Sequence, residues 1–323
     1  MIRKIISTII PSLGTERKRP REEIDVDGEP LPKRGDGLSI LFNHPKNSHM
    51  LLGNMGGVPS MKFDGVRIYG LLRRLKCIFY PHYNYETARH IDRTVPKGEY
   101  TFPHAADGAR KGGKSHSLGA VRGSAVDADL RLWVNNPLLF KQQKSHPAMC
   151  ADIIQAFEIW GWKGICSQFP LVAEEIKVWT GIDMIVRNQD GIPILLELKT
   201  GYRDYLYRYT GMMEGPLSDL PDTPMNQHFL QVGLEWLMAL YCYGYRFPQA
   251  FVIQAVNELG VTPHPLPAWF YERERAIWEY FTQRVRAGVG TPAPAPQSRA
   301  PAAHPPRRHP TAGGRFRRRK VKM

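Results

Sequence analysis

The chain has 323 residues, of which 42% are hydrophobic, and such a composition suits one large globular domain or two small ones. No apolar run approaches the roughly 20 residues that a bilayer-spanning helix needs, which argues against an integral membrane protein. The net charge is +14, but residues 286–323 alone carry ten Lys or Arg and no Asp or Glu, so the basic character lies mostly in a C-terminal tail.

Residues 1–37 have the composition of a disordered N-terminal arm. Two basic clusters, Arg17–Arg21 and Lys33–Arg34, are separated by an acidic spacer and resemble a bipartite nuclear localisation signal. A solvated, charged tail without an address is the other interpretation. The short run that contains Arg3 and Lys4 also suits a mitochondrial presequence, although the acidic residues after it disfavour that signal. The nucleus is therefore the expected location, with the mitochondrion as the alternative.

Folded structure is expected to begin near Leu38 and to form one domain over residues 38–285. Basic and aromatic residues alternate between Arg73 and Tyr85, which suits either a track for a nucleic-acid strand or an amphipathic segment with ordinary surface charge. The four cysteines are far apart and form no C-x-x-C pair. This spacing indicates reduced thiols in a cytosolic or nuclear setting.

Two helices and a strand are predicted next. Apolar residues at helical spacing predict helices over 119–133 and 148–160, and an apolar run predicts a strand over 165–172. One interpretation of Asp127 or Asp129 is a helix-start acid, which is favourable beside the positive end of the helix dipole.

Residues 181–200 carry the clearest local pattern in the chain. The apolar runs Ile182–Val186 and Ile192–Leu198 flank Asn188-Gln189-Asp190-Gly191, a typical turn sequence. The segment therefore predicts a β-hairpin.

The second strand of this hairpin carries a charged pair. Glu197 and Lys199 are two residues apart and point to the same face of a strand, while Leu196 and Leu198 point to the other face, into a core. Burial of these charges is costly unless something compensates for it. A divalent cation bound with the help of Asp183 is one compensation, and a structural Asp–Lys–Glu ion-pair network is the alternative.

The segment 201–225 is rich in Tyr, Gly and Pro and is expected to form a loop over the end of the hairpin. Four of its residues combine aromatic faces with charges that attract phosphate and are candidate DNA contacts: Tyr202, Arg203, Tyr205 and Arg208. Packing of a Tyr-rich loop on the sheet is the alternative.

Residues 226–243 predict a helix that contains Gln231 and, four residues later, Glu235. A strand over 250–256 and a last helix over 271–285 complete the predicted domain. Residues 286–323 are rich in Pro, Ala and Arg, a composition that cannot build a core and therefore predicts a disordered basic tail.

Three of these motifs, in this order, resemble the core of the PD-(D/E)XK nuclease superfamily: Gly-x-Asp at 181–183, Glu-Leu-Lys-Thr at 197–200 and a helical Gln231. The likeness is to the RecB-like and lambda-exonuclease-like branch, including versions carried by large DNA viruses, and it covers residues 123–269. Two positions depart from that branch. Gln168 stands where relatives often have Glu, and Glu235 stands where the Q-x-x-x-Y helix of the branch has Tyr.

The resemblance implies an α/β, restriction-endonuclease-like fold, in which a central mixed β-sheet is flanked by helices and the core spans residues 119–285. It implies a Mg²⁺ or Mn²⁺ site, because hard oxygen donors suit these ions. The implied ligands are Asp183, Glu197, the backbone carbonyl of Leu198 and, as a further candidate, Asp127. An iron–sulfur cluster, which some relatives bind through four cysteines, is not expected here, because the cysteines are scattered.

The resemblance also implies the roles of the catalytic residues, which are Asp183, Glu197, Lys199 and Gln231. Lys199 would orient or help to deprotonate the attacking water and stabilise the transition state, and Gln231 would position the water, a phosphate or Lys199. The expected activity is metal-dependent hydrolysis of DNA, as an exonuclease in replication, recombination or viral genome processing.

The expected partner is DNA, as linear duplex or as single-stranded ends, together with a single-strand annealing or replication protein; a viral protein of this kind would act in the host nucleus. Two other functions stay open. One is a catalytically degenerate DNA-binding or packaging protein, whose basic tail would give salt-sensitive affinity, and the other is a structure-specific endonuclease.

Overall fold

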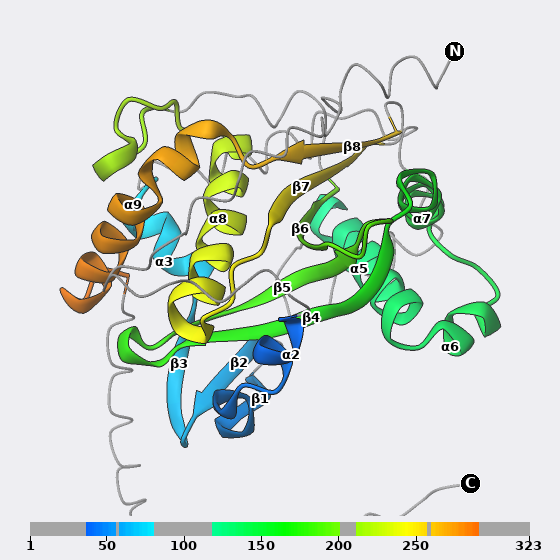
Figure 1. The fold of residues 1–323 in the computed structure, drawn as a ribbon, viewed down its shortest axis with the longest axis horizontal. Helices are drawn as coiled ribbons and strands as arrows, with labels where there is room; N and C mark the ends of the chain where they lie inside the picture. Colours follow the sequence, from blue (N-terminus) through cyan, green and yellow to red (C-terminus); the bar gives the residue numbers. More distant parts are fainter. Residues whose placement is uncertain (1–36, 56–57, 81–117, 201–210, 257–259, 291–323) are drawn as a thin grey trace, which may run out of the picture. The chain divides into compact units, whose positions relative to one another are not determined.

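The computed structural model describes residues 37–55, 58–80, 118–200, 211–256 and 260–290. Within these ranges the chain forms a mixed, eight-stranded sheet with helices on both of its faces (Figure 1). The predicted α/β class and the central mixed sheet flanked by helices are therefore confirmed. The chain divides into two units, residues 1–290 and 291–323, and all described residues belong to the first.

The strands are hydrogen-bonded in the order β1-β2-β3-β5-β6-β7-β8, and β4 also pairs with β5. The pairs β3–β5 and β6–β7 are parallel, and the others are antiparallel. The strands are β1 (Met50–Met55), β2 (Val58–Phe63), β3 (Val66–Gly70), β4 (Lys163–Ala173), β5 (Val178–Arg187), β6 (Pro193–Lys199), β7 (Gln249–Val256) and β8 (Gly260–Pro265).

Helices pack against the two faces of the sheet in two separate cores. The larger core contains buried residues of α2, α3, α8 and α9, and the second contains those of α5 and α7. None of the helices in the described ranges has the length and apolar character needed to cross a membrane. The helices are α2 (Leu38–Phe42), α3 (Leu71–Ile78), α5 (Leu118–Asn135), α6 (Pro137–Gln142), α7 (Ala148–Trp160), α8 (Pro224–Tyr243) and α9 (Ala268–Arg286).

The predicted hairpin is confirmed as β5 and β6. The side chain of Asn188 accepts hydrogen bonds from the backbone N–H groups of Asp190 and Ile192, at 3.0 and 2.9 Å. Gly191 has a φ of +77°, a conformation that glycine adopts without steric cost. The local sequence thus fixes the turn, and the turn fixes the register of the two strands that carry the candidate site.

Helix α8 in the larger core has a defined cap at each end. The hydroxyl of Thr223 accepts a hydrogen bond from the N–H of Asn226 at its start, and Gly244 ends it with a left-handed φ of +66°. Most side chains of α8 are buried, so the helix is held along its whole length. It therefore gives Gln231 and Glu235 a rigid support.

Helix α8 crosses α9 at a glycine. A Cβ atom added at Gly233 would lie 2.3 Å from Cε2 of Phe270, which is itself fully buried. We expect Gly233→Ala to lower the free energy of unfolding by about 2 kcal/mol, because overpacking forces α8 and α9 apart. Urea unfolding checks this. Gly123→Ala in α5, whose added Cβ would lie 3.1 Å from the Thr200 hydroxyl, is the control and should change stability less.

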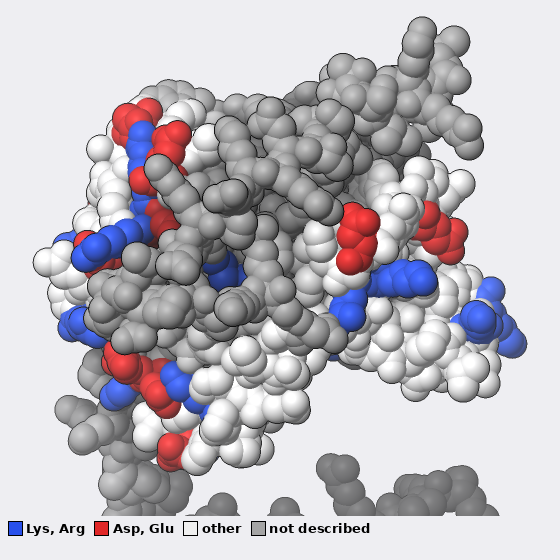
Figure 2. Space-filling view, viewed as in Figure 1, with Lys and Arg blue, Asp and Glu red and all other residues white. Residues whose placement is uncertain are grey.

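On one face of the described structure, charges of both signs are interspersed (Figure 2). On the face shown in Figure 2, described Lys and Arg side chains lie among Asp and Glu side chains and form no continuous basic surface there. The basic clusters predicted for residues 1–37 and 286–323 fall mostly outside the described residues.

Candidate functional site

Asp183 lies where β5 and β6 stop pairing through their backbones. The antiparallel register runs from Arg187 opposite Pro193 to Met184 opposite Leu196. Past this point the N–H of Leu198 donates to Oδ2 of Asp183 at 2.9 Å. A side-chain carboxylate thus takes the position of a backbone acceptor, which holds Asp183 against β6.

Gln168 on β4 joins Asp183 to α5. Its Nε2 donates to Oδ1 of Asp127 at 2.9 Å and to Oδ1 of Asp183 at 3.3 Å. Gln168 has a φ of +56°, which is uncommon for a residue with a Cβ and typical of functional sites and other over-determined positions. The amide therefore separates two carboxylates that would otherwise repel each other.

Helix α5 is tied to β4 beside this bridge. Asn135 and Ser167 exchange two hydrogen bonds, of 3.1 Å between the side chains and 3.3 Å from the backbone N–H of Ser167 to Oδ1 of Asn135. Asp127 also forms an ion pair of 2.8 Å with Arg131, one turn later in the helix. These contacts place Asp127 at the site, one amide away from Asp183.

Glu197 and Lys199 lie on the same face of β6, as predicted. Nζ of Lys199 donates to Oε1 of Glu197, whose side chain is only 1% exposed. Leu196 and Leu198 contact the second core on the opposite face. The other carboxylate oxygen of Glu197, Oε2, is buried and has no hydrogen-bond partner among the described residues.

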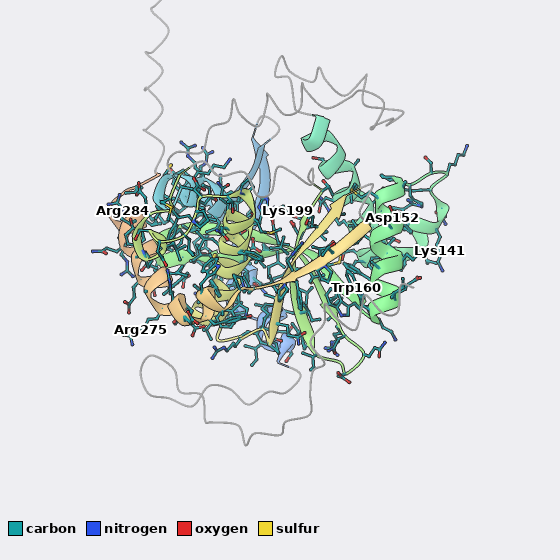
Figure 3. All side chains as sticks on the ribbon, turned by 90° about the horizontal axis from the view of Figure 1, so that it is seen from above. Lys141, Asp152, Trp160, Lys199, Arg275 and Arg284 are labelled. Atoms are coloured by element: carbon teal, nitrogen blue, oxygen red, sulfur yellow. The ribbon has the colours of Figure 1, made fainter. Side chains whose placement is uncertain are left out.

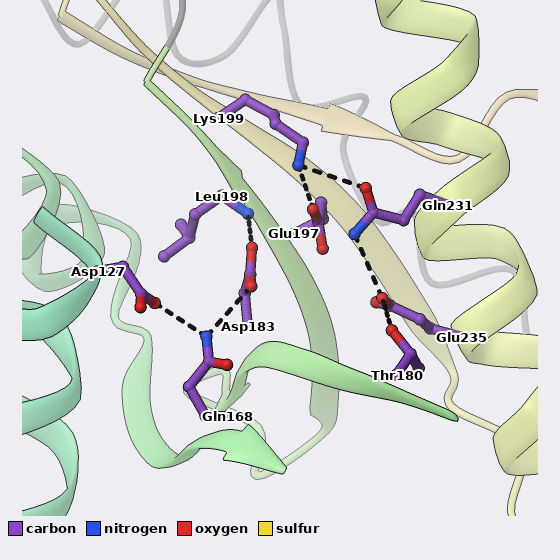
Figure 4. A network of polar contacts seen from close by, with 9 residues as sticks. All are labelled: Asp127, Gln168, Thr180, Asp183, Glu197, Leu198, Lys199, Gln231 and Glu235. Carbon is purple, nitrogen blue, oxygen red and sulfur yellow. Dashed lines mark hydrogen bonds and ion pairs between the residues drawn. The ribbon is translucent and has the colours of Figure 1, made fainter. Parts of the chain in front are cut away.

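Gln231 and Glu235 of α8 complete the site (Figure 4). Nζ of Lys199 donates to Oε1 of Gln231 at 3.4 Å, and Nε2 of Gln231 donates to Oε1 of Glu235 at 3.4 Å. The hydroxyl of Thr180 on β5 donates to the same oxygen of Glu235 at 2.9 Å. Three strands and two helices therefore contribute to two sets of polar contacts that meet on β6 (Figure 4). Lys199 lies between the two layers of helices (Figure 3).

The pKa values of two acids and of the lysine at this site are all shifted upward. Burial, and then the Glu197 carboxylate, raise the pKa of Asp183 well above its usual value; Lys199 and the Leu198 N–H oppose this. Burial, followed by Glu197 and Asp183, also raises the pKa of Glu235 well above its usual value. Burial lowers the pKa of Lys199, but Glu197 and Asp183 together raise it by more, so the net shift of the pKa is upward.

The charge of Lys199 also lowers the pKa values of two nearby basic groups. Burial, and then the charge of Lys199, lower the pKa of His228 on α8 well below its usual value. The same two causes, in the same order, lower the pKa of Lys76 on α3. The charge of Lys199 is therefore felt on both α3 and α8.

Three of the four cysteines do not suit nucleophilic chemistry. All four are free thiols, and burial raises the pKa of Cys150, Cys166 and Cys242 to about 12. A thiolate at neutral pH is therefore strongly disfavoured at these three positions.

The predicted site residues are partly brought together. Glu197, Lys199 and Gln231 belong to one set of hydrogen bonds, and Asp127 and Asp183 belong to a second set that reaches the same strand, β6. Leu198 contributes its N–H to this set, and the role of its carbonyl stays a prediction. The four candidate DNA contacts lie outside the described residues: Tyr202, Arg203, Tyr205 and Arg208.

Sequence reasoning missed Thr180 and treated Glu235 only as a departure from a motif. Glu235 is fully buried, and its Oε2 has no hydrogen-bond partner in the described part of the chain. The available signal was its position four residues after Gln231, which places both side chains on one face of the helix.

The carboxylates of Asp183 and Glu197 are chemically suited to bind a hard divalent cation. No group of three or more His, Cys, Asp or Glu side chains in the described ranges is arranged to hold a metal ion. Mg²⁺, however, is commonly bound by one or two carboxylates together with water and substrate phosphate. Asp183 and Glu197 supply two carboxylates, and the buried Oε2 of Glu197 lacks a donor among the described residues.

Neither protein-family models nor curated protein sequences give a match to this chain. The resemblance to PD-(D/E)XK nucleases therefore depends on the motif residues and on their arrangement alone.

Proposed function

We propose that the chain is a metal-dependent deoxyribonuclease, which acts as an exonuclease on DNA ends. The observation that carries the proposal is the buried pair of Glu197 and Lys199 beside Asp183. Burying a lysine and an acid with one unpartnered oxygen next to a second acid costs folding free energy. A function that needs these side chains would explain why the cost is tolerated. Cation-assisted hydrolysis of a phosphodiester bond is a purpose that uses all three side chains.

The carboxylates of Asp183 and Glu197 would hold the cation, with Leu198 and Asp127 as further ligands. When bound, Mg²⁺ or Mn²⁺ lowers the pKa of a water molecule and neutralises charge on the phosphate. The N–H of Leu198 keeps Asp183 in place on β6.

Lys199 would act as a donor. Its raised pKa keeps the ammonium group protonated at neutral pH, which suits a hydrogen bond to the attacking water or to a phosphate oxygen more than removal of a proton. The carbonyl of Gln231 accepts from the same ammonium group and restrains its position.

A catalytically degenerate DNA-binding protein is the second candidate, and Gln168 favours it. An amide between Asp127 and Asp183 supplies one negative charge fewer than a Glu would supply. Weaker binding of the cation is the expected consequence. For either function, DNA would be the partner and the nucleus the location.

The test compares wild type with Asp183→Asn on linear duplex, single-stranded and closed circular DNA, with Mg²⁺, Mn²⁺ or EDTA. We expect wild type to degrade linear DNA only with a divalent cation, and Asp183→Asn to lose at least about 100-fold in rate, because the variant lacks a cation-binding charge. Asp152→Asn, an exposed acid of α7, is the control.

Two outcomes would change the proposal. Cleavage of closed circular DNA would make the protein an endonuclease. DNA binding by both proteins without cleavage of any substrate would leave the DNA-binding function in its place.

A further inference from the structure

Glu235 is a buried acid that the reaction proposed above does not require. Its side chain is fully buried in α8, and Oε1 accepts hydrogen bonds from Thr180 and from Gln231. Gln231 in turn accepts from Lys199. Four residues thus form a continuous chain of hydrogen bonds from β5 through α8 to the lysine on β6 (Figure 4).

The partners of Gln231 determine which way its amide faces. The Lys199 ammonium group has only donors, so it requires the carbonyl oxygen of the amide. The opposite rotamer would place the NH₂ group against the ammonium group, donor against donor. An acceptor on the other side of Gln231 favours the correct orientation, and Oε1 of Glu235 is that acceptor.

We propose that Glu235 is a positioning residue, which holds the Gln231 amide with its carbonyl oxygen toward Lys199. The inference rests on the proposed nuclease function. It requires an acceptor at Oε1 and not a charge, because the carbonyl oxygen of a protonated acid or of an amide accepts the same two hydrogen bonds.

The structure around Glu235 suits this role. Gln231 and Glu235 are four residues apart on a helix, and side chains at this spacing are neighbours on one face. Thr180 fixes Oε1 from the strand below, at 2.9 Å. All three side chains are at most 8% exposed, so water competes little for their hydrogen bonds.

The experiment uses the full chain and compares Glu235→Leu, Glu235→Met and Glu235→Gln with wild type. Leu and Met fill similar space without an acceptor, whereas Gln keeps a carbonyl oxygen. Gln227→Leu is the matched control, since Gln227 is a buried glutamine one turn before Gln231 in α8 and donates to Asp222 instead. Circular dichroism melts verify that each variant is folded.

Two quantities are measured. The first is cleavage of linear duplex DNA at saturating Mg²⁺, as kcat and KM separately. The second is the side-chain NH₂ signal of Gln231 in ¹⁵N-glutamine-labelled protein, assigned through Gln231→Leu, together with its exchange with solvent. The second quantity needs no enzymatic activity.

We expect Leu and Met at position 235 to lower kcat by about 10- to 100-fold with KM unchanged, because a displaced lysine loses its alignment with the reacting atoms. The Gln231 NH₂ signal should shift and exchange faster in both. Glu235→Gln should retain kcat within about threefold and a protected NH₂ signal, and so should Gln227→Leu.

Three results would overturn the inference: an unchanged NH₂ signal in folded Leu or Met variants, loss of protection in Glu235→Gln, or an equal fall in kcat for Glu235→Gln and Glu235→Leu. If the Leu and Met variants do not fold, Glu235→Gln alone tests the inference. Loss of NH₂ protection in this variant, or a fall in kcat of more than about threefold, would then overturn it. If wild type cleaves no DNA, the proposed function fails, and the NH₂ signals still decide whether Glu235 holds the amide.

Discussion

Replacing Lys199 with Met should lower the rate of DNA cleavage by about 10²- to 10⁴-fold while DNA binding stays within a few-fold of wild type. Met keeps the apolar stem of the side chain and removes only the ammonium group. That group donates to Glu197 and to Gln231, and in the proposed reaction it would donate to the water or phosphate.

The same variant should be less stable. Without Lys199, the Glu197 carboxylate is buried without a compensating charge, and removal of one partner from a buried ion pair costs about 3–5 kcal/mol. Added Mg²⁺ should restore part of this loss, because a cation that binds only the native state stabilises it by mass action.

Single-turnover cleavage, fluorescence anisotropy with labelled DNA and urea unfolding with and without Mg²⁺ measure these effects. Lys141→Met, an exposed lysine of α6, is the control. Cleavage by Lys199→Met within about threefold of wild type would contradict the role of Lys199. Equal loss of stability with and without Mg²⁺ would argue against cation binding beside Glu197.

The second large effect is expected in the pH dependence of stability. The native pKa of Glu235 lies well above 4.5, the value expected for an unperturbed Glu, because of burial and then of the Glu197 and Asp183 charges. Between these two pKa values the native state binds more protons than the unfolded state. The free energy of unfolding therefore falls as the pH rises through this window, about tenfold in the folding equilibrium for each pH unit.

Other groups also contribute to the pH dependence of wild type. Asp183 acts in the same direction as Glu235, because its native pKa is also raised. His228 acts in the opposite direction: its lowered pKa makes stability rise with pH as the unfolded histidine loses its proton near 6.5. A comparison with Glu235→Gln removes one contribution and keeps the others.

We expect Glu235→Gln to gain stability relative to wild type as the pH rises from 5 to 8. Urea unfolding in EDTA at constant ionic strength measures the difference at each pH. Glu158→Gln, an exposed acid of α7, is the control. A difference between wild type and Glu235→Gln that does not change with pH would contradict the raised pKa.

The local patterns predicted the parts of the fold that depend on nearby residues. The turn at 188–191 and the apolar runs beside it predicted the β5–β6 hairpin, and helix α7 begins and ends at the predicted residues. The short strands β1 to β3 and β8, and helix α6, had no such pattern. Glycine or proline lies inside β1, β2 and β8, and β3 and α6 have only five and six residues. They form where the sheet and the helices around them supply partners.

Some residues of the candidate site could likewise be predicted from local patterns, and others could not. A period of two residues was enough to place Glu197 and Lys199 on one face of β6. The bridge from Gln168 to Asp127 and Asp183 depends on a left-handed backbone in the middle of β4, which no local pattern indicates. The place of Glu235 in the site could not be predicted from the sequence. Helix α8 is buried on almost all sides, so its apolar pattern gives little indication of which face meets the sheet.

The double role of Asp183 decides how this site should be probed by mutation. Its carboxylate is a candidate cation ligand and is also the acceptor that secures the N–H of Leu198 at the open end of the hairpin. An alanine scan would abolish both at once, and a loosened strand end would be mistaken for a lost ligand. Asparagine leaves an oxygen for Leu198 and removes the charge together with the 3.3 Å hydrogen bond from Gln168. The amide variant therefore tests the loss of the charge while the end of the strand stays secured.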